Sequence, residues 1–292
     1  AYLLPTLAGL FEASLGRANS VRVAIAILAA IAAIAMLVPS FLIKERDYIS
    51  SVPVKTKAFS SLFKSFKNGQ FRRFVYSDVI YFFAVTLFQT GLAFYITRLM
   101  HADEGNSFIL TVIMTVVSLC LYPAVNKLAP KLGKKKLIVT GFFAYALVFL
   151  ITVFCGEGMV WGYIIAVAAG IPMAILGILP QAVVADIAEA DAIETGEQRS
   201  GMFFAARTFA MKMGQALSLL VFTSMTVSQT EFSYRATAIV ATVFCLIGAV
   251  LFLLYNEKLV MGKITNAVAT ADLTTATVVP SEDANASENA AE

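Results

Sequence analysis

Charged residues are scarce in this sequence. Only 14% of its 292 residues are Asp, Glu, Lys or Arg, whereas 59% are hydrophobic. Soluble domains carry about 25% charged residues, so the composition excludes an ordinary soluble domain. The net charge of +3 is small and the basic residues gather between apolar runs, which excludes a nucleic-acid partner. We expect the lipid bilayer to be the main surrounding of the chain.

Histidine and cysteine are also rare. His101 is the single histidine, and no Ser and Asp constellation accompanies it. Cys120, Cys155 and Cys245 lie in or beside apolar runs without metal-ligand spacing, which is typical of small buried hydrophobic residues. We find no pattern of a nucleophile, a metal site or a phosphate loop, so we predict no enzyme activity, no metal and no cofactor.

Long apolar runs are abundant, and each is near the roughly 20 residues that a helix needs to cross a bilayer. We predict complete spans near 22–43, 74–97, 107–123, 137–155, 160–180, 202–227 and 236–255. Residues 1–16 resemble the end of a truncated span, and no signal peptide is recognisable. We therefore expect a C-terminal piece whose N-terminal half is missing.

Basic residues gather in alternate loops, which sets the predicted orientation. They are frequent in 44–73 and 126–136 and recur at Arg199, Lys258 and Lys263. The opposite loops carry few Lys and Arg residues. Since cytoplasmic loops are enriched in Lys and Arg, we predict a multi-pass protein with a cytoplasmic C-terminus.

The division of the chain follows from these runs. We predict the end of an N-terminal helix bundle at 1–43, a central cytoplasmic loop at 44–73, a six-helix bundle at 74–260 and a disordered tail at 261–292. Within the loop, apolar residues recur at helical spacing with lysines between them (Phe59, Leu62, Phe63 and Phe66; Lys57, Lys64 and Lys67). This pattern favours a basic amphipathic helix on the inner leaflet over a plain linker.

Two motifs lie on the predicted cytoplasmic side. NKLAPKLGKKK, residues 126–136, resembles the major facilitator loop motif through Lys131, Gly133, Lys134 and Lys135, with Pro130 in place of its Asp. Such a loop would turn at the glycine and anchor its cations to anionic lipid or to carboxylates at helix ends, although positive-inside topology alone explains similar lysines.

The second motif, ADIAEADAIETGEQRSGMFFAARTFAMKMGQAL, spans residues 185–217. It resembles the glycoside–pentoside–hexuronide:cation symporter family (melibiose permease-like) of the major facilitator superfamily. The matching residues are Asp186, Asp191, Thr195, Gly196, Glu197, Arg199, Gly201, Thr208, Lys212 and Gly214. The resemblance implies an all-α integral membrane protein of the major facilitator fold, containing the C-terminal six-helix bundle and the last one or two helices of the N-terminal bundle.

Depth separates the two cations of the span near 202–227. At 1.5 Å per residue, Arg207 lies about 8 Å inside and Lys212 about 15 Å. The first could extend to the cytoplasmic surface, whereas a lysine near the midplane costs about 2.5–3.5 kcal/mol. Asp78 lies near the cytoplasmic face and is not an obvious partner. We therefore predict that Lys212 faces a wet cavity or a counter-ion in the missing half.

The resemblance implies roles for these residues. Lys212, Thr208 and Gln215 share one helix face and would line the substrate and cation cavity, to which Gln89 is a further candidate. The predicted acidic loop would form a cytoplasmic gate, although a plain solvated loop is the alternative (Asp186, Glu189, Asp191, Glu197, Arg199 and Arg207). The sugar-stacking aromatic of the family is absent from 175–178. Lys212 could also serve only in a structural salt bridge.

The function implied is cation-coupled (Na⁺ or H⁺) symport of a sugar, glycoside or hexuronide by alternating access, in a cell membrane and most simply a bacterial inner membrane. The alternatives are a transporter of an amphipathic lipid or drug, and a non-transporting membrane scaffold.

Overall fold

The computed structural model describes Phe11 and residues 16–42, 58–101 and 106–278, and within them every regular element is a helix. The elements are α2 (Arg17–Leu42), α3 (Ala58–Ser65), α4 (Gly69–Phe94), the π-helical turn η2 (Tyr95–Leu99), α5 (Asn106–Leu132), α6 (Lys134–Val153), α7 (Met159–Thr195), α8 (Ser200–Met225), α9 (Glu231–Phe252) and α10 (Glu257–Val278). The predicted all-α fold is confirmed.

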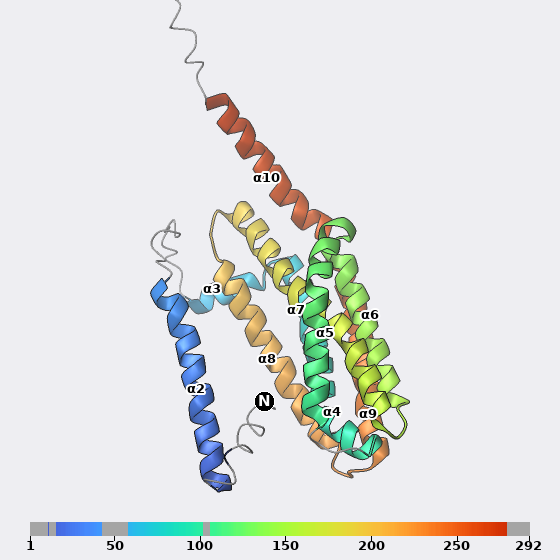
Figure 1. The fold of residues 1–292 in the computed structure, drawn as a ribbon. Helices are drawn as coiled ribbons and strands as arrows, with labels where there is room; N and C mark the ends of the chain where they lie inside the picture. Colours follow the sequence, from blue (N-terminus) through green and yellow to red (C-terminus); the bar gives the residue numbers. More distant parts are fainter. Residues whose placement is uncertain (1–10, 12–15, 43–57, 102–105, 279–292) are drawn as a thin grey trace, which may run out of the picture.

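Six segments of the described part are long and apolar enough to cross a membrane: Ala18–Val38, Gly69–Leu99, Asn106–Leu132, Lys134–Val153, Met159–Thr195 and Glu231–Phe252. Helix α8 falls outside this set, although it is 26 residues long and runs beside the other helices of the bundle (Figure 1). Its polar and charged residues, among them Arg207 and Lys212, lower its hydropathy. The polarity of α8 is thus its distinguishing property.

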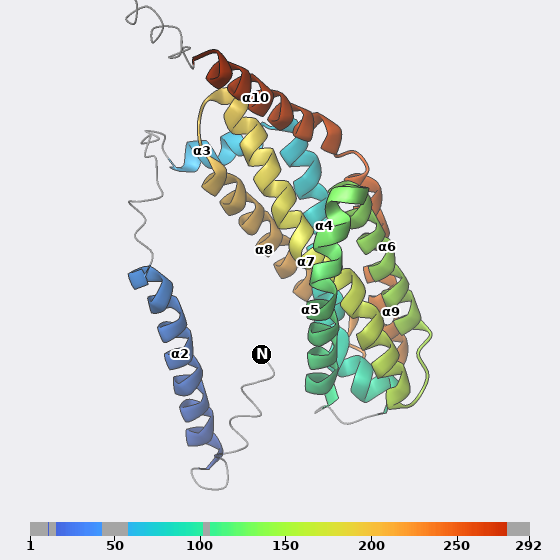
Figure 2. The ribbon, with the colours of Figure 1, turned by 45° about the horizontal axis from the view of Figure 1, so that its top comes forward.

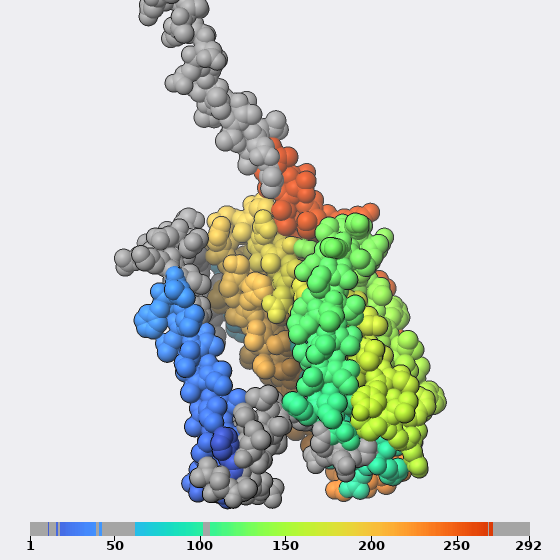
Figure 3. All heavy atoms as spheres, viewed as in Figure 1, coloured from blue at the N-terminus to red at the C-terminus, as the bar shows by residue number. Residues whose placement is uncertain are grey.

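Helices α4 to α9 form one bundle. Helix α4 packs against α8 and α9, α7 packs against α5 and α6, and the contact of α6 with α9 joins the two groups. Helix α2 stands apart from this bundle in both ribbon views (Figures 1 and 2). In the space-filling view, atoms of α8 (orange) remain exposed beside α5 (Figure 3). One face of α8 is therefore not covered by the bundle.

Aromatic side chains fix the position of α4 in the core. Phe71 meets Phe203 of α8 edge to face, with ring centroids 4.8 Å apart. Phe88 meets Phe149 of α6, also at 4.8 Å. Such pairs contribute about 0.5–1.5 kcal/mol each beyond the area that they bury. Helix α4 is therefore the element against which α8 is aligned.

Helices α5 and α7 extend beyond the spans predicted at 107–123 and 160–180. Hydropathy detects only the apolar part of a helix, whereas the 37 residues of α7 are about 55 Å long and exceed a hydrocarbon core of roughly 30 Å. The prediction of an acidic loop is therefore wrong for Asp186–Thr195, which lies in the last turns of α7. The helix ends at Gly196, whose φ of +69° is left-handed.

The C-terminal segment also differs from the prediction. We expected a disordered tail over 261–292, but α10 continues to Val278, and residues 279–292 lie outside the described part. Asn256 caps α10 by accepting from the backbone N–H of Leu259 at 3.2 Å. Lys263 of α10 contacts Glu194 of α7 at 2.5 Å. Local capping and this tertiary contact account for the helix.

The predicted amphipathic helix of the central loop corresponds to α3. Leu62 and Phe66 are half-buried, whereas Phe63 is exposed. Its position on the inner leaflet stays a prediction, and residues 43–57 lie outside the described part, as do 1–10 and 12–15 of the predicted truncated span. Helix α4 begins at Gly69, five residues before the predicted span.

Candidate functional site

Helix α8 has two different faces. Phe203, Arg207, Gly214 and Ser218 are buried on one of them. Ser218 Oγ donates to the Phe83 carbonyl of α4 at 2.9 Å. A Cβ on Gly214 would lie 2.8 Å from the carbonyl oxygen of Val79, so only glycine allows this approach. The buried face of α8 is therefore the face packed on α4.

Arg207 belongs to this buried face. Its Nε and Nη2 donate to the two carboxylate oxygens of Asp78 at 2.8 and 3.1 Å, and the two side chains are 8% and 4% exposed. The guanidinium also lies over the rings of Phe74 and Phe82, at 5.7 and 5.9 Å from their centroids. The interpretation that Arg207 extends to the cytoplasmic surface is therefore wrong.

The starts of α4 and α8 explain why this pair can form. Asp78 lies nine residues after the first residue of α4, and Arg207 lies seven residues after the first residue of α8. At 1.5 Å per residue these depths are about 13 and 10 Å, so the two side chains can meet. Because the predicted span began at 74, Asp78 was placed too close to the surface.

Lys212 lies on the other side of α8. Its side chain is exposed, and within the described part of the chain it makes no hydrogen bond or ion pair. Five residues after Arg207, it lies about 140° around the helix from that residue. The account of Lys212 as a cation without a partner in this bundle thus agrees with its placement.

The other predicted cavity residues lie on α8 and α4. Thr208 is exposed and donates to the Phe204 carbonyl at 2.8 Å, whereas Gln215 is half-buried. Gln89 is exposed on α4 and makes no hydrogen bond to the α8 residues among those described. The structure therefore brings Thr208, Lys212 and Gln215 onto adjacent positions of α8 but does not link Gln89 to them.

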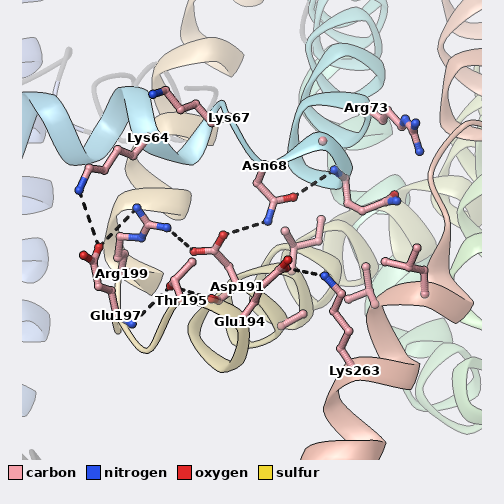
Figure 4. A pocket seen from close by; sticks show the side chains of 16 residues that line it. Lys64, Lys67, Asn68, Arg73, Asp191, Glu194, Thr195, Glu197, Arg199 and Lys263 are labelled. Atoms are coloured by element: carbon pink, nitrogen blue, oxygen red, sulfur yellow. Dashed lines mark hydrogen bonds and ion pairs between the residues drawn. The ribbon is translucent and has the colours of Figure 1, made fainter.

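A second group of charges lies at the ends of α3, α4, α7 and α8 (Figure 4). Arg199 Nη2 donates to Asp191 Oδ2 at 2.8 Å, and both side chains are buried. Asn68 Nδ2 donates to the other oxygen of Asp191 at 3.0 Å. Glu197 lies 3.6 Å from Arg199 and 4.0 Å from Lys64 of α3. These five residues connect the start of α4 with the α7–α8 turn.

Asn68 has two roles in this group. Its Oδ1 accepts from the backbone N–H groups of Gln70 and Phe71 at 3.0 and 3.2 Å, which caps α4. Its amide nitrogen remains available for Asp191. The group borders an open cavity of about 670 Å³ that is lined by both signs of charge, including Lys64, Arg199 and Glu194. An open, charged cavity of this kind indicates the water-facing end of the bundle.

The predicted loop motif forms a third group. Gly133 has a φ of +88°, a conformation that favours glycine, and turns α5 into α6. The carboxylate of Glu257 accepts from the backbone N–H groups of Lys134 and Lys135 at 2.7 and 3.0 Å. Lys134 Nζ contacts Asp186 of α7 at 2.5 Å. Asp186 and Glu257 are thus the two carboxylates that this motif contacts.

Glu257 lies where its charge stabilises the start of α6. It places a negative charge at the N-terminus of α6, where the helix dipole favours one. Burial raises the pKa of the neighbouring Tyr255 hydroxyl, and the charges of Asp186 and Glu257 raise it further. Glu257 was missed from the sequence because it is 123 positions from Lys134. Lys131 makes no hydrogen bond or ion pair in the described structure.

The predicted gate residues therefore separate into several places. Asp186 belongs to the loop-motif group, Arg207 pairs with Asp78, and the Asp191, Glu197 and Arg199 side chains form the group of Figure 4. Glu189 is exposed and has no partner among the described residues. In the described ranges, no group of three His, Cys, Asp or Glu side chains could hold a metal ion.

Comparisons with known proteins identify the family. No curated protein matches the sequence. The family model described as MFS/sugar transport protein matches residues 1–266, which include the whole bundle and both motifs. The described segments that can cross a membrane agree with this match. The chain belongs to the MFS/sugar transport protein family of multi-pass membrane transporters.

Proposed function

We propose that this protein is a secondary active transporter of the melibiose-permease-like symporter family, and that it carries a sugar, glycoside or hexuronide together with Na⁺ or H⁺. The observation that carries the proposal is Lys212. This cation lies on the exposed face of α8 and has no partner among the described residues. A lysine at such depth costs about 2.5–3.5 kcal/mol in a bilayer, so a use for it is expected.

Transport needs a second bundle opposite the exposed face of α8. We propose that a preceding half of the same protein supplies it, together with carboxylates that bind the coupling cation. Lys212, Thr208 and Gln215 would face those carboxylates across a wet cavity. Cation and substrate would then share one cavity, and each would raise the affinity for the other. Two bundles that rock around this site would give alternating access.

The cytoplasmic end is proposed as the gate of this pathway. The Asp191–Arg199 pair joins α7 to α8 next to the cap of α4. A rocking motion changes the relation of these helices to the other bundle, so a charged group here can close one state. We place the C-terminus and α10 in the cytoplasm and the helix bundle in a bacterial inner membrane.

The lipid or drug transporter is retained as the second candidate, because 175–178 lack the sugar-stacking aromatic. The test is uptake by the full-length protein in membrane vesicles. A panel of radiolabelled sugars, hexuronides and a lysolipid is offered with an imposed Na⁺ gradient, an imposed H⁺ gradient, or neither. Gradient-driven sugar accumulation would support the proposal. Uptake of the lysolipid alone would favour the second candidate, and no uptake of any solute would favour a scaffold.

A further inference from the structure

We infer that Asp78 and Arg207 are positioning residues, whose buried ion pair sets the rotation of α8 about its own axis and thereby directs Lys212 away from α4. The inference rests on the proposed function, because it assigns the pair a role in placing the cation of the transport cavity. It concerns two buried residues that the structure pairs with each other.

Contacts with α4 define one side of α8, and the ring pairs Phe203–Phe71 and Phe222–Phe94 lie at the two edges of that side. Arg207 meets Asp78, Gly214 approaches Val79, and Ser218 donates to Phe83. The three α8 residues are separated by seven and four positions, and at 100° per residue they fall within about 40° of one another. With Phe203 and Phe222 included, the face that α8 presents to α4 spans about 100°.

The three contacts do not constrain rotation equally. A glycine and a serine allow the helices to approach closely, but small side chains restrict rotation only weakly. The guanidinium of Arg207 is planar and makes two parallel hydrogen bonds to one carboxylate, which fixes direction as well as distance. The rings of Phe74 and Phe82 restrict it further. The ion pair is therefore the most directional of the polar contacts between α8 and α4.

The rotation of α8 about its axis decides which residues lie on its exposed face. Thr208, Lys212 and Gln215 lie about 100°, 140° and 80° around α8 from Arg207. With Arg207 held on Asp78, all three are directed to the same flank, away from the contact with α4. If Asp78 were neutral, the buried guanidinium would lose its ion-pair partner and would be driven toward water. Helix α8 would rotate with it, and Lys212 would leave its position.

A spin-label scan of α8 in the full-length protein tests this inference. The parent carries Cys120→Ser, since Cys120 is exposed and Cys155 and Cys245 are buried. Single nitroxides replace exposed residues of α8 (Thr208, Phe209, Lys212, Met213, Ala216, Leu217 and Leu220). Collision with oxygen or with a nickel chelate varies with the helical period, and the phase of that variation measures the rotation of α8.

The scan is repeated with Asp78→Asn, with Arg207→Gln and with the exchange Asp78→Arg/Arg207→Asp. We expect each single substitution to shift the phase by roughly 30° or more, on the scale of 100° per residue. Uptake should fall at least tenfold, since small misplacements of a working group are costly. The exchange should restore the parent phase and part of the uptake. An unchanged phase in both single variants overturns the inference.

Single variants that fail to insert are replaced by Asp78→Leu/Arg207→Met, which leaves no unpaired charge and keeps the volume. A shifted or broadened phase in this variant supports the inference, and the parent phase overturns it. The nickel chelate separates this inference from the proposed function. If the label at Lys212 meets oxygen but not nickel in the parent, there is no wet cavity and the proposed function fails, while the phase still tests the ion pair.

Discussion

The two faces of α8 carry the same kind of residue in opposite surroundings. Arg207 is 8% exposed and is bound through two hydrogen bonds to Asp78, whereas Lys212 is exposed and has no partner among the described residues. Five positions and about 140° separate them. Two cations of one helix thus lie in different surroundings: Arg207 holds α8 on α4, whereas Lys212 lies on the exposed side of α8.

The buried face should show the largest loss of stability when one charge is removed. Asp78→Ala leaves Arg207 buried without a counter-ion, and breaking such a pair costs about 3–5 kcal/mol. Thermal unfolding of the purified protein in detergent measures the loss. Glu189→Ala is the control, since Glu189 is exposed on α7 and has no partner among the described residues. Equal melting curves for the two variants would show that the pair is not formed.

The close approach of α8 to α4 gives the next largest effect. In Gly214→Ala the new Cβ would lie 2.8 Å from the Val79 carbonyl oxygen, so the helices must separate, at a cost of about 1–3 kcal/mol. Gly201→Ala is the matched control on the same helix, because a Cβ there meets nothing within 4 Å. Denaturation in detergent compares the two. A loss of stability in Gly201→Ala as large as that in Gly214→Ala would contradict this packing.

Asn68 tests whether the cytoplasmic group depends on the cap of α4. Asn68→Ala removes an N-cap, at about 0.5–2 kcal/mol, and also a donor to Asp191. Asn256→Ala removes the cap of α10 without such a second contact, and we expect a smaller loss. Hydrogen exchange at the first turn of α4 reports the effect directly. Unchanged protection there would show that the cap contributes nothing.

The smallest effect is expected at a long ion pair whose two side chains are exposed. Lys64 and Glu197 lie 4.0 Å apart with side chains about 40% exposed, and pairs of this kind contribute 0–1 kcal/mol. Lys64→Ala should therefore leave the melting temperature within about 2 °C of the parent in scanning calorimetry. A larger drop would mean that α3 is attached to the bundle through this contact.

The sequence predicted the helices well because their apolar runs are local. For the lysines near Gly133 the sequence left anionic lipid, carboxylates and simple positive-inside topology as alternatives, and in the structure Lys134 meets Asp186. Hydropathy was less informative at helix ends. It ended the α7 span at 180 and began the α4 span at 74, because residues beyond the hydrocarbon core can be both polar and helical.

Most of the site contacts join residues that are far apart in the sequence. Asp78 and Arg207 are 129 positions apart, and Asn68 and Asp191 are 123 apart. No periodicity connects such pairs, because their meeting depends on how α4, α7 and α8 pack. Lys212 was noticed because a lysine so far inside a predicted membrane span is itself an anomaly. Its neighbour Arg207 was misjudged because the same depth argument allowed it to reach the surface.

Substitution of Lys212 is the most direct test of the proposed coupled transport. Lys212→Ala and Lys127→Ala are compared for gradient-driven uptake in vesicles, with insertion and melting temperature measured on the same preparations. Lys127 is the control because it is also an exposed lysine with no partner among the described residues. We expect Lys212→Ala to insert and melt like the parent but to lose at least ~100-fold in coupled uptake, the scale for a displaced working group, while Lys127→Ala transports normally. Parent-like uptake by Lys212→Ala would contradict the account.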